Sequence, residues 1–145
     1  MSEKIIELSA NYKPSEDEEY MNDMQLEYFR RKLIEWKESL TKESKETIDH
    51  LKHERLNEPD VNDRASIESD VNFELRTRDR YRKLIDKINA ALQRIKTGSY
   101  GFCVKNFEPI GLKRLEARPI ATLSIRAQEE HERAEKIYSD DSFYY

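Results

Sequence analysis

The stretch that decides the fold is residues 25–40, which read QLEYFRRKLIEWKESL. Its large apolar residues recur at alternating steps of three and four, and this spacing places them on one stripe of an α-helix. They are Leu26, Phe29, Leu33, Trp36 and Leu40. Such a stripe is typical of a helix that packs along its length against a second helix. Because helix propensity stays high beyond the stripe, we expect the helix to continue to about Leu56.

A turn follows this helix at residues 57–63, NEPDVND, where Pro59 lies among Asn and Asp residues that favour turns and helix caps. We expect a second helix from about Arg64 to Gly98, which is a candidate C-cap. The sequence places its apolar seam on Ile67, Val71, Leu75, Ile85, Ile88, Leu92 and Ile95. Two helices of this length joined by a tight turn must run antiparallel.

Composition supports a mainly α fold. The 145 residues include 39% charged residues, against roughly 25% in an ordinary domain, and only three glycines and four prolines, too few to punctuate many strands. We therefore predict a long antiparallel two-helix coiled coil at 22–97 with its tip at 57–65. An N-terminal arm at 1–21 is expected to pack on or near a small globular knob. The knob and a C-terminal helix from about Ser124 to Tyr138 occupy 98–138, and residues 139–145 form a tail.

Several functional classes are excluded by what the sequence lacks. Its apolar runs are too short for a membrane span, and its first residues do not resemble a secretory leader, so a cytoplasmic location is expected. Nucleophile-elbow, phosphate-loop and dinucleotide motifs are missing, which argues against an enzyme. The net charge of −4 and the pI near 5.5 argue against a general nucleic-acid binder.

The predicted tip carries two aspartates, Asp60 and Asp63. Either one of them caps the second helix, or both are held far from the body to reach into the cavity of a partner. The residues alone leave both interpretations open.

A run of basic residues on the second helix has two interpretations as well. It is either a solvated face with local pairs, such as Asp79 with Lys83, or a docking surface for an acidic partner. Its members are Arg76, Arg78, Arg80, Arg82, Lys83 and Lys87. Another basic group, Lys113, Arg114 and Arg118, falls in the knob.

The tip pattern Asp60-x-x-Asp63-x-Ala65 resembles the D-x-x-D-x-A motif of the DksA family of bacterial transcription factors. Further blocks in the same order resemble that family, and together they cover roughly residues 18–130. These blocks are Glu19-Tyr20-Met21-Asn22, Gln25-Leu26, Phe29-Arg30-Arg31, Glu74-Leu75-Arg76, Arg78-Asp79-Arg80, Arg82-Lys83-Leu84-Ile85, and Gly111 with Arg114-Leu115-Glu116-Ala117-Arg118-Pro119. Several blocks in the right order are a stronger signal than one motif.

The resemblance implies a factor that binds RNA polymerase through its secondary channel without binding DNA. Asp63 and Ala65 would be effector residues of the tip and Asp60 a supporting acid. The factor would modulate initiation together with the alarmone ppGpp in the stringent response, repressing ribosomal RNA promoters and activating some biosynthetic ones. We expect it to act as a monomer.

The same resemblance assigns roles to residues of the second helix and the knob. Arg76, Arg80 and Lys83 would bind the polymerase. Leu84, Lys87 and Arg118 would contribute to a ppGpp site at the interface, where the two cations suit phosphate groups.

The chain departs from the family pattern at two places in the knob. Family members typically carry a zinc finger with four cysteines, but here only Cys103 remains, and Asn106, Ser124 and Ala127 stand at the other positions. We therefore expect no zinc, since a structural site needs about four N or S ligands. The knob is instead expected to be held by apolar contacts among Phe102, Phe107, Ile110, Leu112, Leu115 and Leu123. In addition, Gln128 stands where the family usually offers a lysine to ppGpp.

Two other functions compete with this interpretation. A Gre-type transcript-cleavage factor also inserts an acidic coiled-coil tip into the secondary channel, but it ends in a β-rich domain that this C-terminal region hardly supplies. A generic coiled-coil adaptor would use the tip acids only as helix caps.

Overall fold

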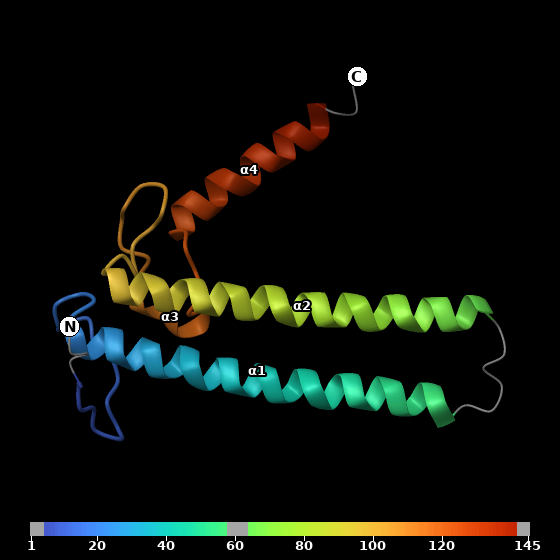
Figure 1. Ribbon diagram of the computed structural model, residues 1–145. Coiled ribbons are helices and arrows are strands. Elements are labelled where there is room, and N and C mark those ends of the chain that lie inside the picture. The colour runs from blue at the N-terminus through green and yellow to red at the C-terminus, as the bar shows by residue number, and fades with distance from the viewer. Residues whose placement is uncertain (1–4, 58–63, 142–145) are drawn as a thin grey trace. The chain divides into compact units, whose positions relative to one another are not determined.

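The computed structural model describes residues 5–57 and 64–141 of the chain (Figure 1). It contains the helices α1 (Asp23–Asn57), α2 (Arg64–Thr97), α3 (Leu112–Ala117) and α4 (Ile125–Asp141). Within the described residues, the only strand-like pairing is a single antiparallel bridge between Phe102 and Pro109. The predicted mainly α fold with two long packed helices is confirmed. None of the described helices is both long and apolar enough to span a membrane.

The chain divides into two compact units, and each is considered by itself. The helical unit is Arg31–Leu92, and the knob unit combines Met1–Arg30 with Gln93–Tyr145. Both long helices contribute to both units, because the first turns of α1 and the last turn of α2 belong to the knob unit.

In the helical unit, α1 and α2 run antiparallel and bury a seam between them (Figure 1). On α1 the buried seam residues are Leu33 and Leu40, as the apolar spacing predicts, and Ile48 beyond the stripe. On α2 they are Tyr81, Ile88 and Ala91.

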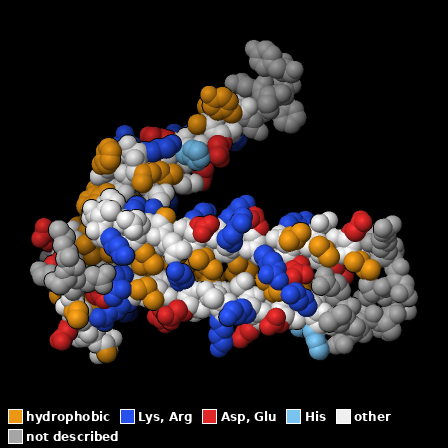
Figure 2. Space-filling view, viewed as in Figure 1, with side chains coloured by type: hydrophobic (Ala, Val, Ile, Leu, Met, Phe, Trp, Pro, Cys, Tyr) orange, Lys and Arg blue, Asp and Glu red, His pale blue; other side chains and the backbone are white. Residues whose placement is uncertain are grey.

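The predicted seam of α2 is wrong in its distal half. Leu75 is 58% exposed, and Ile67 and Val71 are exposed as well, whereas Tyr81 is buried. Counting back from Ile88 in steps of seven, four and three reaches Tyr81, Thr77 and Glu74. Thr77 and Glu74 thus occupy the seam positions here, and both are only partly exposed. Leu75 and Val71 therefore lie beside the seam, whereas Ile67, seven residues before Glu74, keeps the seam register but is still 42% exposed. Figure 2 shows hydrophobic side chains exposed along this part of α2.

The helix ends are fixed by local hydrogen bonds. Asn22 caps α1, because its side-chain oxygen accepts the backbone N–H of Gln25 at 2.8 Å. Gly98 follows α2 with φ +83°, as the C-cap prediction requires, and the N–H of Ser99 returns to the carbonyl of Arg94 at 3.0 Å. This is the Schellman pattern, in which a left-handed glycine lets the chain satisfy the last carbonyls of the helix.

The core of the knob unit is built around Tyr100, which is almost fully buried and packs with its ring 5.7 Å from that of Phe29. Leu115 of α3 is fully buried, and Ile110 is buried too. The N-terminal segment joins this unit through Tyr20, whose hydroxyl donates to the carbonyl of Gly101 at 2.6 Å and accepts the N–H of Gly111 at 3.0 Å.

Three expectations for the knob region need correction. Phe107 is 78% exposed and contributes little to the core; it follows a tight turn, with φ +60° and its N–H bonded to the carbonyl of Cys103 at 2.9 Å. Helix α3 was not predicted, because its six residues are too few to show a helical period in the sequence. The last helix continues to Asp141, beyond the expected end at Tyr138.

Candidate functional site

Four cations of α2 form what we call the basic stripe: Arg76, Arg80, Lys83 and Lys87. Their spacing of four, three and four residues places them on one side of the helix. All four are exposed, so the stripe is a solvent-accessible surface of the helical unit.

Neighbouring acids neutralise only part of the basic run. Asp79 binds Lys83 at 2.9 Å, which confirms the predicted pair, and it binds Arg82 at 2.7 Å. The hydrogen bond from Lys83 is the main cause that lowers the pKa of Asp79, and the charges of Lys83 and Arg82 add to it. Arg78 likewise binds Glu74 at 2.9 Å. Arg78, Arg82 and Lys83 therefore have local partners, as a solvated helix face would.

Arg76, Arg80 and Lys87 differ from these three cations. In the part of the chain that the structure describes, none of them has an acidic partner. The guanidinium of Arg80 lies 5.6 Å from the centroid of the Tyr81 ring, a contact that orients it without neutralising it. These three cations are available to carboxylates or phosphates of a binding partner.

The remaining predicted ligand-binding residues lie in different units. Leu84 is half-buried beside the seam of the helical unit, and Lys87 is exposed there. Arg118 is an exposed residue of the knob unit at the end of α3, where its N–H bonds the carbonyl of Arg114 at 2.8 Å. Asp60 and Asp63 of the tip lie outside the described residues, and Ala65 is described only as part of the first turn of α2.

The four positions that the resemblance assigns to zinc-binding cysteines lie in the knob unit. Cys103 is fully buried, and its sulfur accepts hydrogen bonds from the backbone N–H groups of Lys105, Asn106 and Ser124 and from the Ser124 hydroxyl. Burial raises the pKa of the Cys103 thiol, but these hydrogen bonds outweigh burial and lower the pKa overall. The Ser124 oxygen also accepts the N–H of Ala127 at 3.2 Å.

Gln128 lies in the first turn of α4 and is half-buried. Its side-chain amide donates to Glu132 one turn later at 3.0 Å, so it is held along the helix. It provides no positive charge where the resemblance expects a lysine.

Comparisons with known proteins decide the family. Residues 25–95 match the family model described as DnaK suppressor protein DksA, N-terminal domain, and residues 98–133 match the prokaryotic dksA/traR C4-type zinc finger. A protein of Caulobacter vibrioides named RNA polymerase-binding transcription factor DksA is 59% identical over 91% of this chain and 93% of its own length. The chain belongs to the DksA family.

Other members of the DksA family agree with this assignment. The protein of the same name from Escherichia coli strain K12 is 45% identical over 79% of this chain and 76% of its own length. The structure of transcription factor DksA2 from Pseudomonas aeruginosa superimposes with a TM-score of 0.71 at 38% identity, covering 81% of this chain and 90% of that one. The resemblance based on the tip and helix blocks is thus confirmed.

The zinc that this family model implies does not fit the residues present. A four-cysteine site needs four thiolates, and this chain supplies one at Cys103, with an amide, a hydroxyl and a methyl side chain at the other positions. Among the described residues, no group of three or more His, Cys, Asp or Glu is placed to hold a metal ion.

Two features of the unit cores were missed at the level of sequence. Gln25 is fully buried because its side chain accepts the N–H of Met21 at 2.8 Å and donates to the carbonyl of Ser15 at 3.2 Å. The spacing of Asn22 and Gln25 is that of a capping box, and this signal could have revealed the start of α1. The double hydrogen bond of Tyr20 joins segments far apart in sequence, and no local pattern indicates it.

Proposed function

We propose that this chain binds RNA polymerase directly and regulates the initiation of transcription. The observation that carries the proposal is the match over nearly the whole chain to a relative named as an RNA polymerase-binding transcription factor. The exposed Arg76 and Arg80, which have no acidic partner in the described structure, supply a surface that suits an acidic region of the polymerase.

In this proposal the protein is a regulator and not an enzyme. It acts as a monomer in the cytoplasm, where RNA polymerase works, and it needs no contact with DNA. The coiled coil enters the secondary channel, Asp63 and Ala65 act at its tip with support from Asp60, and Lys83 adds to the grip of Arg76 and Arg80.

The proposal extends to ppGpp as an effector. Leu84, Lys87 and Arg118 would contribute to its site at the interface with the polymerase, where Lys87 and Arg118 bind phosphate groups. The effect on promoters is repression of ribosomal RNA synthesis and activation of some biosynthetic genes. The protein does this without zinc, because Cys103 alone cannot hold the ion.

A binding measurement tests whether the basic stripe contacts the polymerase. The double variant Arg76→Ala with Arg80→Ala is compared with wild type by fluorescence anisotropy of chains labelled at the N-terminus. Lys52→Ala with Lys96→Ala is the control, because it removes the same charge from two exposed positions of α1 and α2 outside the stripe. We expect the first variant to bind at least about tenfold more weakly, equivalent to about 1.4 kcal/mol, and the control to bind like wild type. Equal affinity of all three proteins would exclude the basic stripe as the contact.

A further inference from the structure

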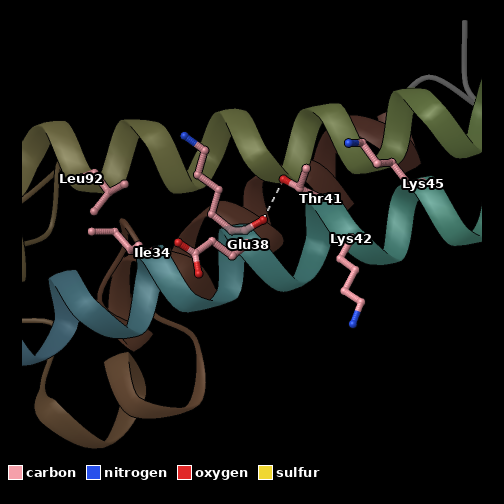
Figure 3. Close-up of a pocket in the computed structure, with 7 residues that line it drawn as sticks. Ile34, Glu38, Thr41, Lys42, Lys45 and Leu92 are labelled. Carbon is pink, nitrogen blue, oxygen red and sulfur yellow. Dashed lines mark hydrogen bonds between the residues drawn. The ribbon is translucent and has the colours of Figure 1, made fainter.

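The helical unit contains a pocket that the proposed roles do not use. It has a volume of about 500 Å³ and is lined from α1 by Ile34, Lys37, Glu38, Thr41, Lys42 and Lys45, and from α2 by Leu92 (Figure 3). Ile34, Glu38, Thr41 and Lys45 follow one another at steps of four, three and four residues, so the pocket extends along one side of α1. Eleven residues of helix correspond to a length of about 16 Å.

The pocket combines an apolar floor with a basic rim. Ile34 and Leu92 point toward each other from the two helices and form the floor (Figure 3). Three lysines and one glutamate provide the charges around it, so the rim is positive. Lys45 lies on the side of α1 toward α2, whereas Lys42 points outward from the edge.

The lysines of this rim are available to a partner. Within the described chain, no ion pair engages the ammonium groups of Lys37 or Lys45. The hydroxyl of Thr41 is already used, since it donates to the backbone carbonyl of Lys37 at 2.9 Å (Figure 3). The polar atoms that remain for an occupant are therefore mainly cationic.

The pocket and the basic stripe lie on different sides of α2. Leu92 follows Lys87 by five residues, which is a rotation of about 140° around the helix axis. An occupant of the pocket would thus approach the helical unit from a different direction than a partner held by Arg76 and Arg80.

We propose that this pocket receives an acidic amphipathic helix of RNA polymerase, an inference that rests on the proposed function. Apolar side chains of that helix enter between Ile34 and Leu92, and its carboxylates pair with Lys37 and Lys45. The net positive charge of the rim favours an acidic occupant, and the extension of the pocket along α1 fits about three turns of helix. The volume accommodates a few aliphatic side chains and lies in the range of ordinary ligand pockets.

Two variants test this proposal by different means. Lys37→Gln with Lys45→Gln removes the rim charges, and its control Lys52→Gln with Lys96→Gln removes equal charge elsewhere. Thr41→Trp fills the pocket without changing the charge, and its control Ser39→Trp adds the same ring at an exposed position of α1 that does not line the pocket. Circular dichroism checks that all four variants keep the helical content of wild type.

The measurement is the affinity of each labelled chain for RNA polymerase. We expect each pocket variant to bind about tenfold more weakly and each control to bind like wild type, with a shallower salt dependence for the lysine variant. If wild type binds and the pocket variants bind equally well, the pocket inference is wrong and the proposed function stands. If wild type itself does not bind, the proposed function fails.

A small amphiphile is the competing occupant, and anilinonaphthalene sulfonate is the probe for it. If the probe binds wild type, Thr41→Trp abolishes this binding, and the affinity for polymerase stays unchanged, the pocket is a small-molecule site and the proposal is overturned.

Discussion

The buried hydroxyl of Tyr100 donates a hydrogen bond to the carbonyl oxygen of Pro119 at 2.7 Å. This bond joins the residues that follow α2 to those that follow α3, and the Tyr100 ring packs against Phe29 of α1 at the same point. Burial raises the pKa of Tyr100, so its hydroxyl remains protonated and able to donate throughout the physiological range. The knob unit therefore depends on a hydrogen-bonded aromatic core.

Tyr100→Phe removes the hydroxyl and leaves the carbonyl of Pro119 without its partner. We expect the free energy of unfolding to fall by about 1–2 kcal/mol, because a buried acceptor loses its hydrogen bond. Urea denaturation followed by circular dichroism measures the change. Tyr138→Phe is the control, since Tyr138 is largely exposed, and a loss of the same size there would show that the Tyr100 hydroxyl has no special role.

Tyr28 predicts a loss of stability at alkaline pH. Burial, together with the hydrogen bond and the negative charge of Glu116, raises the pKa of Tyr28 to about 12. The unfolded chain has a tyrosine pKa near ~10, so the folded state holds the proton more tightly. The contribution of protonated Tyr28 to the free energy of unfolding is complete below pH ~10 and is lost as the pH rises through about 12.

The Tyr28→Phe variant tests this pH dependence. Its free energy of unfolding, measured by urea titration between pH ~9 and ~12, should fall less steeply than that of wild type. Some decline will remain, because burial also raises the pKa of Tyr12 to about 12. Identical slopes for the two proteins would contradict the assigned role of the Glu116 contact.

The cluster around Cys103 predicts that zinc binding can be created. The variant Asn106→Cys with Ser124→Cys and Ala127→Cys would complete a set of four thiolates with the native Cys103. We expect one zinc ion per chain to remain after dialysis, measured by elemental analysis, and none to remain on wild type. Zinc retained by wild type would refute the expectation that this chain works without the metal.

Gln128→Lys tests the weakened ppGpp site. A lysine there would add a charge-assisted hydrogen bond to phosphate, and we expect ppGpp binding to the complex with polymerase to strengthen by about 1–2 kcal/mol. The readout is the concentration of ppGpp that gives half of its effect on initiation. Gln93→Lys, at an exposed position near the end of α2, is the control with equal charge. An unchanged response to ppGpp would show that Gln128 does not weaken the ppGpp site.

The proximal seam could be predicted from the sequence because its period is regular. Leu33 and Leu40 are buried where the spacing places them, and α2 ends at Thr97 before the expected glycine. The error at Leu75 has a physical cause. In the distal half of α2, Thr77 and Glu74 occupy the seam positions. A count of apolar residues therefore placed the seam on Leu75, which lies beside it.

The site was only partly predictable for a different reason. The exposure of Arg76 and Arg80 follows from helical periodicity, and the Asp79 to Lys83 pair follows from their spacing. The pocket between Ile34 and Leu92 depends on how two distant segments pack, and the hydrogen bonds that collect at Cys103 depend on the path of a loop. Neither feature leaves a periodic signal in the sequence.

The most direct test of the central claim is single-round transcription from a ribosomal RNA promoter with cognate RNA polymerase. Wild type is compared with Asp63→Asn, each with and without ppGpp. We predict that wild type represses the promoter, that ppGpp strengthens this repression, and that the variant loses it while still binding the polymerase. Equal repression by both proteins would mean that Asp63 only caps a helix, and no repression by either would contradict the proposed function.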